Sequence, residues 1–211
     1  MNTKKGVSLM PRGETNCNQL KDERRSLIIK SALKLFSLKG YDSVKINDIA
    51  KEASCTHSLL YHYYDSKEAI FKDVMENGYH SLRENTLLFD DYEEDAKKAL
   101  EYFVNKVYIL LNTDNDSCYH FYLVTNLHYQ HTLPISKEKF HEMVENGVWM
   151  HIYNIVKKGI EQGTFYEGIP EVLTNVFYCT LRGLLFDRIN TPFNEYHSPD
   201  EKTLLHILLK N

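Results

Sequence analysis

The sequence has few of the residues that interrupt helices. Its 211 residues include only five prolines and nine glycines. The alternating pattern of half-buried strands is almost absent, and apolar residues recur at the three- and four-residue spacing of amphipathic helices. The sequence therefore predicts an all-α protein.

Long apolar runs and paired cysteines are also missing. No stretch approaches the roughly 20 apolar residues that span a bilayer, and the first twenty residues lack the apolar segment of a secretory signal. The four cysteines form no CxxC pair, which argues against a zinc knuckle or a disulfide framework and fits a reducing compartment. We expect a soluble, cytoplasmic protein.

No motif of a familiar catalytic centre occurs. The sequence has no Gly-rich phosphate loop, no GxSxG and no HExxH, so we expect a protein that is not an enzyme and has no cofactor. Cys118, His120, His128 and His131 are the nearest approach to a metal cluster. Histidines without a metal ion are the preferred interpretation, and metal sensing is the alternative.

Charge is distributed unevenly along the chain. Residues 1–70 hold 12 Lys and Arg against 8 Asp and Glu, a net charge of +4. The remaining residues hold 13 against 21, a net charge of −8. This asymmetry indicates that only the N-terminal part meets a polyanion.

Helix start and stop signals divide the chain into three parts. We expect a flexible arm at residues 1–20, a helix-turn-helix domain at 21–67 and a larger helical domain at 68–211. The expected helices span residues 22–39, 45–53, 56–64, 66–88, 93–112, 116–131, 136–162, 170–190 and 199–209.

Two short helices joined by a tight turn at residues 54–55 form the helix-turn-helix pattern. Thr56 is the expected N-cap of the second of them. Asp65 and Glu68 resemble a capping box for the helix that follows.

A helical wheel of residues 57–64 separates an inner from an outer face. Leu60 and Tyr64 lie together and are expected to face the other helices. The outer face is small, polar and aromatic, which suits a major groove, where such side chains reach base edges and phosphates. Its residues are Ser58, Leu59 and His62, flanked by Tyr61 and Tyr63.

Lys67 supports a nucleic-acid interpretation. A cation in the first turn of a helix opposes the helix dipole, but a phosphate placed there is favoured by both the ammonium and the free N–H groups. We therefore expect Tyr61 and Lys67 to contact the DNA backbone. The alternative is a three-helix bundle with aromatic surface residues that binds no nucleic acid.

Residues 22–75 resemble the N-terminal domain of the tetracycline-repressor (TetR) family of bacterial transcriptional regulators. The resemblance rests on Ala32, Phe36, Gly40-Tyr41, Ile49-Ala50, Leu60-Tyr61, the aromatic Tyr64 and Ser66-Lys67-Glu68. The chain departs from the family pattern at Ser54, where Gly is usual, and at Lys45, Leu59 and Tyr63.

The resemblance implies phosphate contacts by Tyr61 and Lys67, and it implies that residues 57–59 and 62–63 of the recognition helix face DNA. With the start of the preceding helix added, the candidate DNA-binding residues are Lys45, Asn47, Thr56, His57, Ser58, Leu59, Tyr61, His62, Tyr63 and Lys67.

The C-terminal half is rich in aromatic residues, which either form its core or line a pocket between helices. The resemblance implies that this domain binds a small-molecule effector, which the sequence does not identify. The candidate pocket residues are Tyr108, Phe121, Tyr122, His128, Trp149, Tyr153 and Phe177.

The last two expected helices carry wide apolar surfaces. We expect a four-helix dimer interface with two helices from each chain, as the resemblance also implies. Docking within one subunit is the alternative. The candidate interface residues are Leu173, Phe177, Leu181, Leu184, Leu205 and Leu208.

These observations predict a homodimeric, sequence-specific regulator that binds a near-palindromic DNA operator. We expect it to be a repressor that an effector releases from the operator. Two other classes remain open: a helical binding protein whose N-terminal domain binds no DNA, and a metal- or cofactor-dependent helical enzyme built on the histidines.

Overall fold

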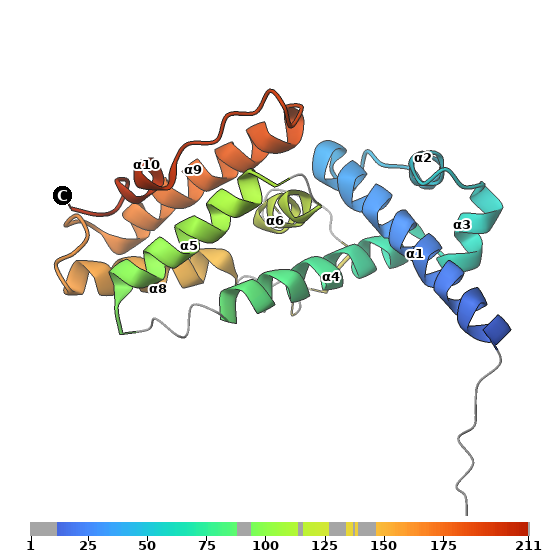
Figure 1. The fold of residues 1–211 in the computed structure, drawn as a ribbon, viewed down its shortest axis with the longest axis horizontal. Coiled ribbons are helices and arrows are strands. Elements are labelled where there is room, and N and C mark those ends of the chain that lie inside the picture. The colour runs from blue at the N-terminus through green and yellow to red at the C-terminus, as the bar shows by residue number, and fades with distance from the viewer. Residues whose placement is uncertain are drawn as a thin grey trace, which may run out of the picture.

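The computed structural model describes residues 12–87, 94–113, 116–126, 134–136, 138 and 147–210. Within these ranges every regular element is a helix, which confirms the predicted all-α fold (Figure 1). The helices are α1 (Arg12–Lys39), α2 (Ile46–Glu52), α3 (His57–Tyr63), α4 (Lys67–Leu87), α5 (Ala96–Leu111), α6 (Ser117–Thr125), α8 (Val148–Glu161), α9 (Pro170–Asn190) and α10 (Glu201–Leu205).

The helices form two groups joined by α4 and α6. Helices α1, α2 and α3 lie at one end, which we call the head, and α5, α8, α9 and α10 lie at the other (Figure 1). Helix α4 runs from the head toward the second group, and α6 lies between the two and packs against α1, α4 and α9.

The head has its own hydrophobic core. Ile28 and Phe36 of α1, Ile49 of α2, Leu60 of α3 and Phe71 of α4 are fully buried in it. The rings of Phe36 and Phe71 meet edge to face with centroids 5.2 Å apart. The periodic apolar residues of the sequence therefore face one another as the amphipathic patterns predict.

The first helix is longer than its apolar pattern indicates. The flexible arm expected at residues 1–20 is wrong from Arg12 onward, because α1 begins there; residues 1–11 lie outside the described part. Among the side chains of α1 that the structure describes, the first buried apolar one is Ile28, and Leu20 is 61% exposed. The sequence of residues 12–21 carries no apolar stripe, so hydrophobic periodicity could not predict the added turns.

The turn between α2 and α3 uses a residue in the left-handed conformation. Ser54 has a φ of +49°. Its N–H donates to the carbonyl of Lys51 (3.1 Å), and the N–H of Cys55 donates to the carbonyl of Ala50 (2.9 Å). This is the Schellman arrangement, in which glycine is usual because it has no Cβ.

Side chains cap the helices of the head. As predicted, Thr56 caps α3, since its Oγ1 accepts from the N–H of Leu59 (3.2 Å). The cap expected from Asp65 is wrong. Ser66 takes that role for α4, with Oγ accepting from the N–H of Ala69 (3.2 Å). Both residues favour N-cap positions, so the local sequence alone could not choose between neighbours.

Helix α2 is capped from within. The side chain of Lys45, the N-cap residue, makes no capping hydrogen bond, but the N–H of Lys45 donates to Oδ2 of Asp48 (2.9 Å). This is the half of a capping box that the third helical residue supplies.

Three expected helices of the C-terminal half end differently. The expectation of one helix at 136–162 is wrong. Gly147 has an extended backbone (φ −85°, ψ 171°), and α8 begins only after it. The helix expected at 116–131 ends at Thr125, and residues 127–131 lie outside the described part. The helix expected at 199–209 ends at Leu205.

Beyond α10 the chain pairs with the segment that precedes α9. Leu209 and Phe165 form an isolated antiparallel bridge, and the N–H of Tyr166 donates to the carbonyl of Leu208 (3.0 Å). Phe165 and Leu208 are fully buried. This arrangement explains why apolar residues surround the expected last helix: residues 206–208 form turns, and Leu208 and Leu209 pack into the core beside Phe165.

The second core joins α5, α6, α8, α9 and α10. Phe177 of α9 packs 6.1 Å from Phe103 of α5. Arg188 of α9 is also buried. Its Nε and Nη2 donate to the carbonyls of Leu111 (3.0 Å) and Thr113 (3.2 Å). This cation thus supplies hydrogen-bond donors to carbonyls at the C-terminal end of α5.

Gly159 leaves room for Phe165. A Cβ on Gly159 would overlap with Cδ2 of the buried Phe165 ring. We therefore expect Gly159→Ala to lower the free energy of unfolding by about 2–3 kcal/mol, measured by urea denaturation. Asn154→Ala, at an exposed position of the same helix, is the control and should change stability by less than about 0.5 kcal/mol. Equal stability of the two variants would contradict the packing argument.

The left-handed Ser54 gives a second stability prediction. Replacing Ser54 by Gly removes the Cβ clash, so the free energy of unfolding should rise by up to about 1 kcal/mol. Ser54→Val should lower it, because a β-branched residue fits this conformation poorly. Thermal denaturation of both variants checks the order. A Gly variant less stable than the wild type would show that the turn does not adopt this conformation.

Candidate DNA-binding surface

The outer face of α3 is a continuous polar and aromatic surface at the end of the head. His57, Ser58, Tyr61 and His62 are exposed. Tyr61 remains 43% exposed and meets His57 with ring centroids 4.6 Å apart. The structure thus brings these candidates together on one helix face, with an aromatic surface and several hydrogen-bonding groups.

Two further candidates lie at the edges of this face. Leu59 and Tyr63 are half-buried, and the ring of His62 lies 5.5 Å from that of Tyr63. Thr56 uses its hydroxyl oxygen to cap α3. The hydroxyl hydrogen of Thr56 still provides a donor toward a ligand.

The inner face of α3 is fixed to two other helices by a side-chain triad. The Nε of Arg25 in α1 donates to the Tyr64 hydroxyl (3.0 Å), which donates to Oδ2 of Asp73 in α4 (2.7 Å). Arg25 and Asp73 also form an ion pair of 2.5 Å. Burial is the main reason that the pKa of Tyr64 rises to about 12, so the hydroxyl keeps its proton and acts as a donor.

Sequence reasoning missed Arg25 and Asp73. They lie 39 and 9 residues from Tyr64, and no helical periodicity links such separations. The available signal was the hydroxyl of Tyr64, since a buried tyrosine oxygen needs partners.

Lys67 makes contacts within the protein that the sequence did not indicate. Its Nζ donates to the carbonyls of Tyr41 (2.9 Å) and Val44 (3.0 Å) and lies 4.0 Å from the centroid of the Tyr41 ring. The Tyr41 hydroxyl donates to Oε1 of Glu68 (2.9 Å), and burial raises the pKa of Tyr41. The first turn of α4 therefore holds the loop that leads into α2.

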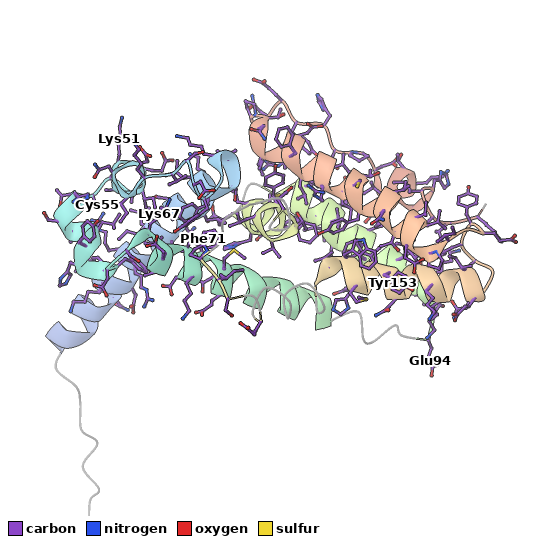
Figure 2. All side chains as sticks on the ribbon, turned by 180° about the vertical axis from the view of Figure 1, so that it is seen from behind. Lys51, Cys55, Lys67, Phe71, Glu94 and Tyr153 are labelled. Atoms are coloured by element: carbon purple, nitrogen blue, oxygen red, sulfur yellow. The ribbon has the colours of Figure 1, made fainter. Side chains whose placement is uncertain are left out.

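Figure 2 shows how the cations of the head are placed. Lys67 lies near the buried Phe71, while Lys51 points outward from α2. Lys45 and Asn47, at the start of α2, are also exposed. Cations that can reach a phosphate therefore lie beside α3, at both ends of α2.

Helix α6 connects the head to the second group. The Ser37 hydroxyl of α1 donates to the carbonyl of Tyr119 (3.1 Å), and Lys30 pairs with Asp116 (2.9 Å). On its other side, the Asn126 side chain accepts from Nη2 of Arg182 in α9 (2.6 Å). The contacts of α6 thus lead from α9 to the head.

His120 lies in the same junction. A Cβ on Gly78 of α4 would lie 2.8 Å from its Nδ1, so α4 and α6 are in close contact here. Burial lowers the pKa of His120 against the opposing effect of Asp116. The imidazole is therefore held mainly neutral at the contact.

The structure does not gather the candidate pocket residues around one site. Phe121 and Phe177 belong to the core of the second group, while Tyr108 on α5 is 36% exposed. Trp149 and Tyr153 stack on each other along α8, with centroids 5.4 Å apart.

The remaining pocket candidates are dispersed too. Tyr122 packs against Phe186 of α9, with ring centroids 6.0 Å apart, and His128 lies outside the described residues. Trp149 and Tyr153 are tied to α9, since Nε1 of Trp149 donates to Asn175 (2.8 Å) and the Tyr153 hydroxyl donates to Glu171 (3.2 Å).

Half of the candidate dimer residues lie inside one subunit. Phe177, Leu181 and Leu208 are at most 1% exposed in its core, so a second copy cannot reach them; this part of the expected interface is wrong. Leu173, Leu184 and Leu205 are half-buried. The exposed apolar residues of α9 are Val172, Val176 and Phe186.

Metal-ligating side chains do not cluster in the described ranges. These ranges contain no group of three or more His, Cys, Asp or Glu residues that could hold a metal ion; His128 and His131 are not among them. No helix in the same ranges is long and apolar enough to cross a membrane.

Known proteins are similar in sequence mainly to the N-terminal part of the chain, which contains the head. Residues 28–74 match the family model described as "Bacterial regulatory proteins, tetR family". The uncharacterized HTH-type transcriptional regulator YdgC of Bacillus subtilis is 34% identical over 99 residues, 44% of this chain and 50% of YdgC. The negative transcriptional regulator IcaR of the icaADBC biofilm operon of Staphylococcus epidermidis is 44% identical over 50 residues, 24% of this chain and 27% of IcaR. The chain spans half or less of these relatives.

Solved structures share the fold over most of the chain. A mutant of HlyIIR has a TM-score of 0.65 at 15% identity, covering 97% of this chain and 100% of that one. A gamma-butyrolactone receptor (ArpA-like protein) has a TM-score of 0.59 at 19% identity, covering 77% and 82%. The family match spans α1 to the first turns of α4, where the helix-turn-helix and its outward recognition face lie. Residues 28–74 therefore form a DNA-binding domain of the kind described as bacterial regulatory proteins of the tetR family, and the described helices as a whole share their fold with the solved structures.

Proposed function

We propose that this protein is a dimeric repressor that binds a near-palindromic operator and is released from it by a small-molecule effector. The observation that carries the proposal is the outer face of α3, where His57, Ser58, Tyr61 and His62 are exposed together beside the cations of α2. Such a face combines groups that reach base edges with groups that neutralise phosphates. A protein that acts on DNA in this way would work in the cytoplasm.

The recognition helix would enter the major groove. Ser58 and His62 point away from the core and would meet base edges, and Leu59 would meet a thymine methyl group. Tyr61, Lys45 and Asn47 would contact the backbone on the flanks. Lys67 would add a phosphate contact while two of its hydrogen bonds hold the loop before α2.

The proposed dimer interface uses α8 and α9. These helices pack against each other, and the outer face of α9 exposes Val172, Val176 and Phe186. At Gly183 a Cβ would meet nothing within 4 Å, so this face is open to a close partner. In contrast, α10 packs on α5 of its own subunit, where Nδ2 of Asn105 donates to Glu201 (2.6 Å).

An effector in the second group would act on the head through α6. The contacts of α6 with Arg182 on one side and with Ser37 and Lys30 on the other provide the route. An effector shifts the balance only by its difference in affinity for the two states. The proposal of a repressor with a small-molecule effector is supported by IcaR, a negative regulator, and by a fold neighbour that is a gamma-butyrolactone receptor.

The proposal is tested by binding to the DNA that flanks the protein's own gene, in the presence of competitor DNA. Lys45 is exposed, so Lys45→Ala should weaken operator binding by roughly tenfold and flatten the salt dependence by about 0.9 for each phosphate that is no longer neutralised. Its melting temperature should not change. Lys67→Ala should lower both affinity and melting temperature, because it also removes the hydrogen bonds from Nζ to the carbonyls of Tyr41 and Val44.

The two lysine variants separate a role in DNA binding from a structural one. If Lys45→Ala bound with the affinity and salt slope of the wild type, Lys45 would not lie on the DNA surface. If genome-wide selection of bound fragments recovered no sequence at all, the regulator proposal itself would fail.

The proposed interface predicts the effect of a charge on α9. Val176→Glu should convert the dimer to monomers, because it places a carboxylate in an apolar contact, and operator affinity should fall because the second head is no longer attached. Light scattering after gel filtration measures the mass. Ile109→Glu is the matched control: Ile109 on α5 is 50% exposed and Val176 is 53% exposed. Dissociation of both variants, or of neither, would contradict this interface.

A further inference from the structure

The recognition helix carries no permanent positive charge. Residues 52–66 contain no lysine and no arginine, while Glu52 and Asp65 supply two negative charges. Affinity for duplex DNA comes largely from cations that replace condensed counterions. In the proposed complex α3 lies deepest in the groove. With neutral histidines it would release few counterions and add little to the binding free energy.

Two histidines stand where those cations are missing. His62 lies near the centre of the outer face of α3, and His57 lies on its flank against Tyr61. Both side chains are exposed. Within the described residues neither imidazole pairs with a carboxylate. An imidazole is the side chain whose charge changes most readily near neutral pH.

Three carboxylates on the helices next to α3 already have partners within the protein. Glu52 pairs with Lys34 (2.7 Å), Asp73 with Arg25 (2.5 Å), and Glu68 accepts from Tyr41. Further charged groups near α3 in the sequence and on its neighbouring helices are Lys45, Asp48 and Lys51 at α2, Arg24 of α1, Lys67 of α4 and Asp65 in the connection to α4.

We infer that operator binding is coupled to protonation of His57 and His62, so that both imidazoles take up protons as the head docks on DNA. This inference rests on the proposed function. The negative potential of the groove stabilises the charged form of each imidazole. Binding therefore consumes protons, and affinity rises as the pH falls. Each bound imidazolium also replaces a counterion, so the salt dependence should steepen at low pH.

The test measures operator affinity at about pH 8 and about pH 6, at constant ionic strength. Wild-type protein should bind at least about tenfold more tightly at the lower pH. The double variant His57→Gln/His62→Gln should gain less than about twofold. The matched control His197→Gln/His206→Gln, at exposed positions of the C-terminal domain, should gain as much as the wild type.

Proton uptake is measured directly by titration calorimetry of the wild type in two buffers of different ionisation enthalpy. This second measurement tests proton uptake even if the double variant binds the operator too weakly for its affinity to be measured. Uptake near zero, or an undiminished pH effect in the His57/His62 variant, overturns the inference and leaves the regulator proposal in place. Absence of specific binding by the wild type at both pH values overturns the proposed function itself.

Discussion

Both ends of the helix-turn-helix are held by hydrogen bonds to α4. The first turn of α4 places the Lys67 ammonium between the carbonyls of Tyr41 and Val44, which fixes the loop that enters α2. Further along the same helix, Asp73 accepts from Tyr64, the residue that ends α3. With the inner faces of α2 and α3 buried, the position of α4 determines the position of the recognition surface.

In the proposed complex the Lys67 ammonium would have two roles at once. Its Nζ donates to two backbone carbonyls, of which that of Tyr41 also accepts from the N–H of Val44 (3.3 Å), and in the proposed complex the same Nζ would also meet a phosphate. A neutral residue could not do both. The Lys67 ammonium lies over the Tyr41 ring, with Nζ 4.0 Å from the ring centroid, while it donates to the two carbonyls.

In the proposed release by an effector, α6 would connect the second group to the head. The Lys30–Asp116 pair is largely exposed and contributes modestly, whereas the contact of His120 with the α4 backbone at Gly78 allows little relative movement without separation of the helices. A shift of α6 relative to α9 would therefore be transmitted to α4 as a displacement of whole helices, since close-packed contacts do not deform gradually.

The local rules of helix formation predicted the head well, and the C-terminal half less well. The N-cap Thr56, the inward Leu60 and Tyr64 and the tight turn at residue 54 each depend on neighbours within four residues. The partners of Tyr64 and Lys67 could not be predicted in this way, since only the packing of the head brings them together. Apolar periodicity at residues 204–209 indicated a helix and a dimer surface, but Leu208 is buried because the chain pairs with the segment before α9. Apolar periodicity predicts that a residue will be buried, but it does not predict which part of the protein will cover that residue.

The pairing of Leu209 with Phe165 has a consequence for synthesis of the chain. The core of the head draws on residues 28–75 and, beyond them, on Leu123, so most of its contacts are short-range and can form while the ribosome is still translating. The second core includes Leu204, Leu208 and Leu209 and remains incomplete until those residues have emerged. During that interval a nascent chain carries a nearly finished head beside an unsealed second core, and its exposed apolar surface would be the one that chaperones meet.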